Sequence, residues 1–303
     1  MKIVLTGSVG NISQPLTNSL VHDGHDVTVI STNPAKRSII NELGATAAIG
    51  SIDDADFLSQ AFKGADAVYC MVPPNFREPD PVAYYIRVTN NYAKAVQAAQ
   101  VKRVVYLSSY GADQEKGTGV ITGSHEGEKI LKAIPGLSLT FVRPGYFYYN
   151  LLSFVKMIKA TGFIAANYGS TDKLLLVAPS DIAAAVAEEL LHPQTSNKVR
   201  YVASDDRSCN DIAAVLGKAI GIPHLQWKVL TNEEMRAGLL ANGVPVAMAE
   251  SLTELGAATH NGKLRGDFDL HPITLGKVKL EDYAATFAAV FHATNLDVPS
   301  GHE

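Results

Sequence analysis

Cysteine, positive charge and long apolar runs are scarce in this chain of 303 residues, and each scarcity excludes a class of protein. Its two cysteines, Cys70 and Cys209, stand far apart, which excludes a disulfide framework and a C-x-x-C metal pair. His260, His271 and His292 lack metal-ligand spacing, so we expect no metal site. The net charge of −4 argues against binding nucleic acid through bulk positive charge. No apolar run approaches the roughly 18 residues of a membrane-spanning helix, so we expect no membrane segment.

The same scarcities bear on location and size. Few cysteines favour a reducing compartment, and the first apolar run begins at Lys2, which leaves no room for a signal peptide before it. We therefore expect a cytoplasmic protein. Apolar residues make up 47% and charged residues 18% of the chain, so its composition is that of a globular protein with one large domain or a domain and a smaller lobe.

Short apolar runs alternate with amphipathic runs through the first half of the sequence. They predict strands over 2–6, 26–31, 45–49, 66–72, 102–108 and 137–143, and helices over 11–22, 34–43, 54–63, 80–100 and 123–133. Continuous apolar strands separated by helices indicate a parallel sheet that is covered on both faces. With right-handed crossovers, this is a doubly wound α/β fold.

The alternation loosens after Asn150, so we expect a first domain over 1–150 and a mixed segment over 151–303. Within that segment, about 174–203 should complete the sheet, with strands over 174–177 and 198–203 and a helix over 182–191 capped by Ser180 or Asp181. Residues of about 151–172 and 222–278 should form a small, mostly helical substrate lobe over the carboxyl edge of the sheet. Further helices are expected over 208–220 and 279–292, and a strand with two helices over 224–262.

A glycine turn follows the first strand, in the segment Gly7-Ser-Val-Gly10-Asn-Ile-Ser13. Strand, glycine turn and helix are the layout that a nucleotide pyrophosphate requires, because the backbone can approach the phosphates and the helix start offers free N–H groups. Ser13 is small enough for the close packing that a third glycine usually provides. The residues predicted to contact the cofactor here are Thr6, Gly7, Val9, Gly10, Asn11 and Ile12. The alternative is a strand-to-helix connection that binds nothing.

The end of the second strand indicates which dinucleotide binds. A carboxylate usually stands there in NAD sites, where it binds the ribose 2′-hydroxyl. This chain has Thr32 and Asn33 instead, with Lys36 and Arg37 just beyond, and these donors suit a 2′-phosphate. We therefore predict that NADP(H) is preferred, with NAD(H) possible. The alternative is that Lys36 and Arg37 belong to a solvated helix face.

The ends of the later strands supply the remaining cofactor candidates, because ligands of open parallel sheets bind outside the carboxyl ends of the strands. Some of these residues are expected to flank the adenine, and the others the nicotinamide and its ribose. They are Ile52, Asp53, Met71, Val72, Pro73, Ser108, Pro144, Gly145, Tyr146 and Phe147.

Nearly the whole chain resembles the NmrA-like branch of the atypical short-chain dehydrogenases. The matching segments are Gly7-x-x-Gly10, Thr32-Asn33-Pro34, Ser108-Ser109, Glu128, Arg143-Pro-Gly-x-Phe147-x-x-Asn150, Asp181-Ile182 and the late segment 239–255. The resemblance implies an NAD(P)-binding Rossmann domain over 1–150, a small C-terminal substrate lobe and a preference for NADP(H).

Two departures from that pattern limit what the resemblance implies. Typical short-chain dehydrogenases carry Tyr-x-x-x-Lys in the helix after strand five, and this chain has Val120 and Ser124 at those places. Thr32 also stands where many relatives have Arg. Some NmrA-like proteins reduce quinones or similar acceptors, whereas others act as sensors of the cofactor.

Ser109, His125 and Tyr146 are the predicted catalytic residues, since a reduced acceptor needs a hydrogen-bond or proton donor at its developing oxyanion. His125 could instead face solvent, and Ser109 could serve only as a cap or cofactor contact. We predict an NAD(P)H-dependent reductase of a small flat acceptor such as a quinone, bound by the aromatic residues of 146–149 and by 224–262. The alternatives are a non-catalytic NADP(H) sensor with a regulatory partner and, more weakly, an NAD(P)-dependent isomerase or epimerase. A homodimer stays open.

Overall fold

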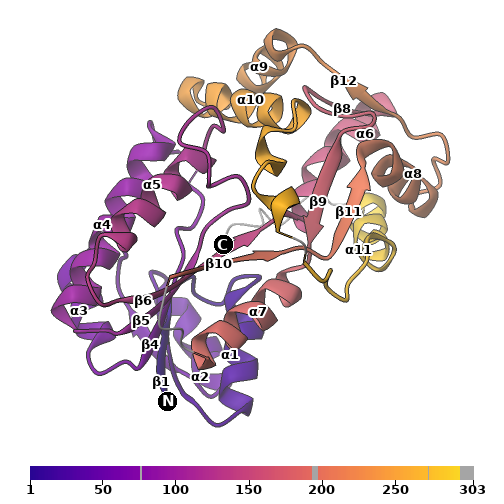
Figure 1. Ribbon diagram of the computed structural model, residues 1–303. Helices are drawn as coiled ribbons and strands as arrows, with labels where there is room; N and C mark the ends of the chain where they lie inside the picture. Colours follow the sequence, from indigo (N-terminus) through magenta and orange to yellow (C-terminus); the bar gives the residue numbers. More distant parts are fainter. Residues whose placement is uncertain (76, 193–196, 272, 294–303) are drawn as a thin grey trace.

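A seven-stranded parallel sheet forms the centre of the computed structural model, which describes residues 1–75, 77–192, 197–271 and 273–293 (Figure 1). Across the sheet the strands follow one another as β3 (Thr46–Ile49), β2 (Asp26–Ser31), β1 (Lys2–Leu5), β4 (Ala67–Cys70), β5 (Arg103–Leu107), β6 (Ser138–Pro144) and β10 (Lys198–Val202). The direction of winding reverses between β1 and β4. In doubly wound sheets, ligands bind in a crevice at such a reversal, outside the carboxyl ends of the strands.

Helices cover both faces of this sheet, so the predicted doubly wound Rossmann fold is confirmed (Figure 1). One face is covered by α1 (Ser13–His22), α2 (Arg37–Glu42) and α7 (Pro179–Leu191), and the other by α3 (Ala55–Phe62), α4 (Pro81–Ala98) and α5 (Ile121–Lys132). Neighbouring residues of β4 contribute to the cores on opposite faces of the sheet. Tyr69 belongs to the core beside α1, α2 and α7, and Cys70 to the core beside α3, α4 and α5. This two-sided burial explains why the strands are apolar throughout rather than alternating.

The remainder of the chain builds a smaller lobe beyond the carboxyl edge (Figure 1). Its helices are α6 (Val155–Thr161), α8 (Cys209–Ala219), α9 (Asn232–Ala241), α10 (Val246–His260) and α11 (Leu280–His292). Its strands form two small sheets: β7 (Tyr146–Phe147), β9 (Lys173–Val177) and β11 (Asp205–Ser208) in one, and β8 (Ile164–Ala166) with β12 (Trp227–Val229) in the other. The 3-10 helices η2 (Tyr148–Phe154), η3 (Lys263–Arg265) and η4 (Phe268–Leu270) complete it.

Two expectations for the second half were wrong in detail. The strand over 174–177 is β9, but it pairs with β7 and antiparallel β11, because β10 already occupies the place beside β6; the predicted strand over 198–203 does extend the main sheet. Helix α7 begins at Pro179, whose fixed φ suits a first helical position, and no side chain caps it. Asp181 instead accepts a hydrogen bond from Ser204 Oγ at 2.6 Å. The division of the chain into domains at residue 150 stays a prediction.

A buried ion pair joins the sheet to the lobe. Arg143 donates from Nε to Glu128 Oε1 and from Nη2 to Glu128 Oε2, both at 2.8 Å. Glu128 also accepts from Ser108 Oγ at 2.7 Å. On the lobe side, Arg143 Nη1 donates to Tyr201 OH at 3.0 Å and to Asp267 Oδ2 at 3.2 Å. One guanidinium therefore connects the end of β5, helix α5, strand β10 and the segment before η4.

Arg143 keeps its positive charge in this pair. Burial by itself lowers the pKa of Arg143, but the hydrogen bonds and negative charge of Glu128 outweigh burial and raise the pKa overall. Arg143 is 4% exposed and Glu128 2% exposed, so removing either partner would leave the other charge buried. Breaking such a pair is costly even where forming it yields little net stability.

We expect Arg143→Met to lower the free energy of unfolding by about 3–5 kcal/mol, because Glu128 would stay buried without its main partner. Arg236→Met is the matched control, since Arg236 pairs with Glu250 at 2.9 Å where both side chains are exposed; it should cost less than about 1 kcal/mol. Urea unfolding of the two variants measures the difference. Equal costs would contradict the importance given to the buried pair.

Candidate cofactor and active site

The glycine turn lies where the strand order reverses between β1 and β4. Gly7 has φ +93°, and a Cβ there would lie 2.7 Å from Ser13 Oγ and 3.1 Å from Met71 Cγ, so only glycine fits. Ser13 is buried and donates from Oγ to Thr6 O at 3.0 Å, which ties the start of α1 to the end of β1. The serine thus provides the close helix-strand contact expected of it.

Gly10 differs from Gly7. Its φ is not among the positive values, and a Cβ would meet only Gly7 O, at 3.2 Å. The backbone here does not itself demand glycine, so a dihedral requirement at Gly10 is not supported. Around the turn, Val9 is half-buried, Asn11 is exposed and Ile12 is buried. Space for a ligand is therefore the remaining reason for a glycine at position 10.

The end of β2 is held by hydroxyl groups. Ser8 donates from Oγ to Ser31 Oγ at 2.9 Å, and Asn33 Oδ1 caps the next turn by accepting from Ala35 N at 2.9 Å. Thr32 and Arg37 are exposed and Lys36 is half-exposed. Within the described part of the chain, neither cation forms an ion pair, and both stay available to an anion.

Helix α4 holds the loops that follow β3 and β4. Arg87 donates to Asp53 Oδ1 at 3.0 Å and to Glu78 Oε1 at 2.9 Å, and Asn91 Nδ2 donates to Ile52 O at 3.2 Å. The Asp53 carboxylate is therefore engaged by a protein cation. Sequence reasoning missed Arg87 and Asn91, although their spacing of four residues places them on one face of a helix.

The segment after β4 is fixed by its backbone. Met71 N donates to Thr6 Oγ1 at 2.9 Å, and Met71 O accepts from Tyr92 OH at 2.6 Å. Val72 is buried and Pro73 half-buried. These contacts bring the ends of β1 and β4 together beside the glycine turn, so the predicted contacts at Thr6 and Met71 lie close to one another.

Both serines at the end of β5 use their hydroxyl protons within the protein. Ser108 Oγ donates to Glu128 Oε1, and Ser109 Oγ donates to Tyr110 O at 3.1 Å. Each oxygen can still accept a hydrogen bond, but neither serine has a second O–H to donate. Ser108 and Ser109 are thus poorly suited as proton donors in this arrangement.

His125 and Tyr146 lie in different surroundings. His125 Nδ1 lies 2.9 Å from Ala112 O, so Nδ1 donates to this carbonyl oxygen and Nε2 is the ring nitrogen left for other contacts. Tyr146 packs against the core of the lobe, where burial raises its pKa, the hydrogen bond with Tyr168 offsets part of the rise, and the resulting pKa is about 12. Among the described residues, no hydrogen bond joins the side chains of Ser109, His125 and Tyr146 to one another, and their catalytic role stays a prediction.

The end of β6 turns sharply towards the lobe. Pro144 is buried, and a Cβ on Gly145 would lie 2.1 Å from Leu175 O, so glycine allows β6 and β9 to approach. Phe147 then packs against the core under the sheet while Tyr146 packs into the lobe, as expected for alternate residues of a strand.

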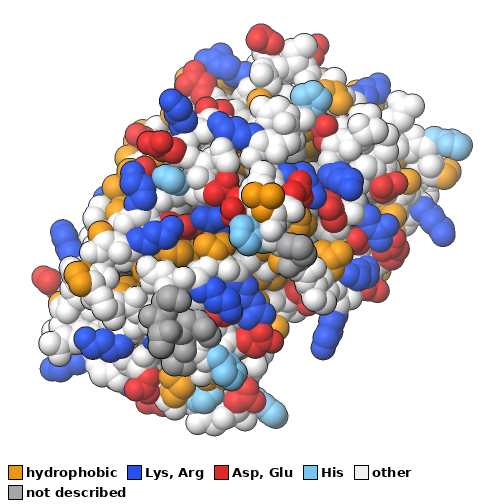
Figure 2. All heavy atoms as spheres, in the orientation of Figure 1, with side chains coloured by type: hydrophobic (Ala, Val, Ile, Leu, Met, Phe, Trp, Pro, Cys, Tyr) orange, Lys and Arg blue, Asp and Glu red, His pale blue; other side chains and the backbone are white. Residues whose placement is uncertain are grey.

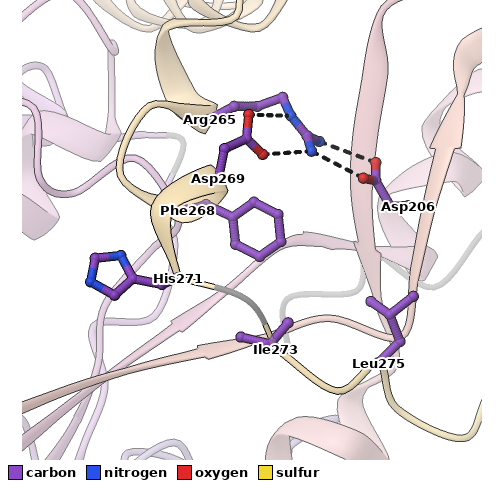
Figure 3. Close-up of a pocket in the computed structure, with 7 residues that line it drawn as sticks. All are labelled: Asp206, Arg265, Phe268, Asp269, His271, Ile273 and Leu275. Carbon is purple, nitrogen blue, oxygen red and sulfur yellow. Dashed lines mark hydrogen bonds and ion pairs between the residues drawn. The ribbon is translucent and has the colours of Figure 1, made fainter.

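A separate hollow of about 330 Å³ lies beside η3 and η4 (Figure 3). Arg265 crosses it and pairs with Asp206 at 3.0 Å and Asp269 at 2.9 Å, so its guanidinium is already satisfied. The lining residues include none of the predicted site residues; they are Asp206, Arg265, Phe268, Asp269, His271, Ile273 and Leu275.

The described residues contain neither a metal centre nor a membrane-spanning helix. No cluster of His, Cys, Asp and Glu there could hold a metal ion. Helices long and apolar enough to cross a membrane are also lacking in that part of the chain. On the face shown in Figure 2, Lys and Arg are interspersed with Asp and Glu rather than gathered in a basic stripe.

Comparisons with known proteins agree with this geometry. The chain is similar to an NAD(P)H azoreductase of Xenophilus azovorans, with 26% identity over 96% of this chain and 99% of that protein. Its fold is similar to an NADPH-dependent quinone oxidoreductase of Escherichia coli solved with NADPH, with TM-score 0.77 and 24% identity over 94% of this chain and 99% of that one. It is also similar to the triphenylmethane reductase of a Citrobacter species solved with NADP(H), with TM-score 0.77 and 20% identity over 94% and 99% of the two chains.

The family model of the NmrA-like family matches residues 1–281, which include the glycine turn, the buried Arg143–Glu128 pair and most of the lobe. This match spans the sheet and the lobe together, and it agrees with the motifs that the sequence carries. The chain therefore belongs to the NmrA-like family.

Proposed function

We propose that this protein is an NADPH-dependent reductase of small, flat, electron-poor acceptors such as quinones or azo compounds. The observation that carries the proposal is the reversal of strand order between β1 and β4, where the glycine turn lies beside the hydrogen bond from Met71 N to Thr6 Oγ1. The Pro144–Phe147 segment follows β6, on the same parallel sheet. The azoreductase, quinone oxidoreductase and triphenylmethane reductase to which the chain is similar support the same class of reaction.

The residues present fit a dinucleotide along this edge. The turn from Gly7 to Ile12 would receive the pyrophosphate at the start of α1. Thr32, Asn33, Lys36 and Arg37 would receive the 2′-phosphate, since the end of β2 offers donors and no carboxylate. Ile52 and Asp53 would flank the adenine. Met71, Val72, Pro73, Ser108, Pro144, Gly145 and Phe147 would surround the nicotinamide end.

Bound NADPH supplies the hydride, and the protein supplies position and electrostatics. The reduced acceptor then needs a proton. Ser108 and Ser109 already donate their hydroxyl protons to protein oxygens, and neutral His125 has its proton on the ring nitrogen that faces Ala112. Solvent or a protonated His125 would then supply the proton that the reduced acceptor needs. A quinone suits this site because its product is a stabilised aromatic oxyanion that needs less help than the product of a simple ketone.

A cofactor sensor without turnover is the second candidate function. It is favoured by the missing Tyr-x-x-x-Lys pair, since Val120 and buried Ser124 occupy those places. Tight NADPH binding with no turnover of any quinone or azo acceptor, together with capture of a partner only in one redox state, would establish the sensor and refute the reductase.

We expect Gly10→Val to abolish NADPH binding while the protein stays folded, because the valine would fill space needed by the pyrophosphate and meets only Gly7 O on the protein side. Gly238→Val, where a Cβ meets nothing within 4 Å, is the control. Calorimetric titration gives the affinities and circular dichroism the fold. Unchanged affinity in the Gly10 variant would refute this placement of the pyrophosphate.

The protein should bind NADPH at least tenfold more tightly than NADH, because charge-assisted hydrogen bonds to the 2′-phosphate contribute about 1.5–3 kcal/mol each. The double variant Lys36→Ala/Arg37→Ala should lose most of this preference and keep its affinity for NADH. Titrations with both cofactors test this, and a wild-type protein that binds both equally would overturn the NADP assignment.

Single removal of Ser109, His125 or Tyr146 should lower kcat/KM only modestly, because the chain lacks one dedicated acid. We therefore expect Ser109→Ala, His125→Ala and Tyr146→Phe each to lose less than the roughly 10²–10⁴-fold typical of an essential acid or base. Steady-state kinetics with NADPH and a quinone give the values. A loss of that full size in one variant that still folds and binds NADPH would identify a catalytic acid.

A further inference from the structure

Four consecutive aromatic residues, 146–149, follow the turn at the end of β6, and three of them are committed to protein cores. Tyr146 and Tyr148 pack into the lobe, where the Tyr148 ring stacks on Tyr283 at 5.1 Å. Phe147 packs against the core between the main sheet and helices α1, α2 and α7. Among the described residues, Tyr149 stands apart, because it joins none of the hydrophobic clusters.

Tyr149 nevertheless has a defined place. Its ring lies against Phe147, with the centroids 5.2 Å apart and the ring planes tilted by 39°. The residue is half-buried, so part of its surface stays accessible. Burial, followed by the nearby Tyr85 hydroxyl, raises the pKa of Tyr149, and the phenol is neutral at physiological pH. A neutral ring in this position can stack on another flat ring.

The neighbouring aromatic side chains cannot take this role. Tyr85 packs tightly between α4 and α5, where a Cβ on Gly123 would lie 2.7 Å from Tyr85 Cβ. Tyr69 is fully buried in the core beneath the sheet. Of these aromatic residues, Tyr149 is thus the half-buried one that belongs to no hydrophobic cluster.

We propose that Tyr149 is the specificity-determining residue that stacks on the flat acceptor, with Phe147 fixing the tilt of its ring. This inference rests on the proposed reductase function and assigns to one residue the preference for extended aromatic acceptors. Aromatic rings prefer offset or tilted arrangements, and a second fused ring on the acceptor adds stacking area. A two-ring quinone should therefore depend on Tyr149 more than a one-ring quinone does.

The test compares Tyr149→Ala and Tyr149→Phe with wild type, using 1,4-naphthoquinone and 1,4-benzoquinone as acceptors. Tyr149→Ala should raise KM about 10-fold for naphthoquinone and about 3-fold for benzoquinone, with kcat changed less than about 3-fold, as loss of stacking predicts. Tyr149→Phe should stay within about 2-fold of wild type, since it keeps the ring. Affinity for NADPH should be unchanged in both variants.

Phe291→Ala is the matched control, because it removes a half-buried ring on α11, outside the segments assigned to acceptor and cofactor, where Lys159 Nζ lies 5.3 Å from the ring centroid. It should leave both KM values unchanged. The stacking role of Tyr149 would be overturned if Tyr149→Ala raised the two KM values equally or changed neither. The reductase proposal would still stand in that case, provided that the wild-type protein turns over the quinones.

A calorimetric titration of naphthoquinone into the NADP⁺ complex separates this inference from the proposed function. If wild type binds naphthoquinone without turning it over and Tyr149→Ala binds it about 10-fold more weakly, the stacking role stands and the reductase proposal fails. If naphthoquinone binds equally to wild type and Tyr149→Ala, or to neither, the role of Tyr149 is refuted.

Discussion

The bidentate ion pair between Arg143 and Glu128 fixes the geometry on which the candidate site depends. It sets the direction in which the chain leaves β6, and Pro144 to Phe147 follow directly from that point. Through Glu128 it orients Ser108, and through Tyr201 and Asp267 it reaches the lobe. A flexible or neutral side chain at position 143 could not satisfy these partners at once, because only a guanidinium offers several donors in a fixed plane.

The same network limits the chemistry that the site can perform. Hydroxyl groups at the end of β5 are used to satisfy buried acceptors, which leaves them unable to donate to a substrate. The helix positions that carry a tyrosine and a lysine in typical short-chain dehydrogenases hold Val120 and Ser124. Such a site favours acceptors that accept hydride readily and bind through their flat faces, and Tyr149, whose ring lies against Phe147, is the residue proposed to stack on them.

The sequence predicted the first half of the fold well because each strand there is a continuous apolar run between helices with clear periodicity. Elements of two to four residues, such as β7 and β11, are too short to show any period, and the placement of β9 depends on partners distant in sequence. The candidate cofactor residues could be predicted because they stand just after the strands, and the carboxyl ends of parallel strands lie at one edge of the sheet. Arg87 and the orientation of Tyr146 were missed, because the hydrogen bonds of Arg87 and the core that receives Tyr146 are tertiary contacts.

Hydride transfer in a single turnover tests the central claim most directly. Protein saturated with one equivalent of NADPH is mixed with naphthoquinone, and the loss of NADPH absorbance is followed for normal cofactor and for cofactor deuterated at the transferring C4 position. The account predicts complete oxidation of the bound NADPH, much faster than in free solution, with a slower rate for the deuterated form. Bound NADPH that is oxidised no faster than free NADPH, by quinone, azo and triphenylmethane acceptors alike, would contradict it.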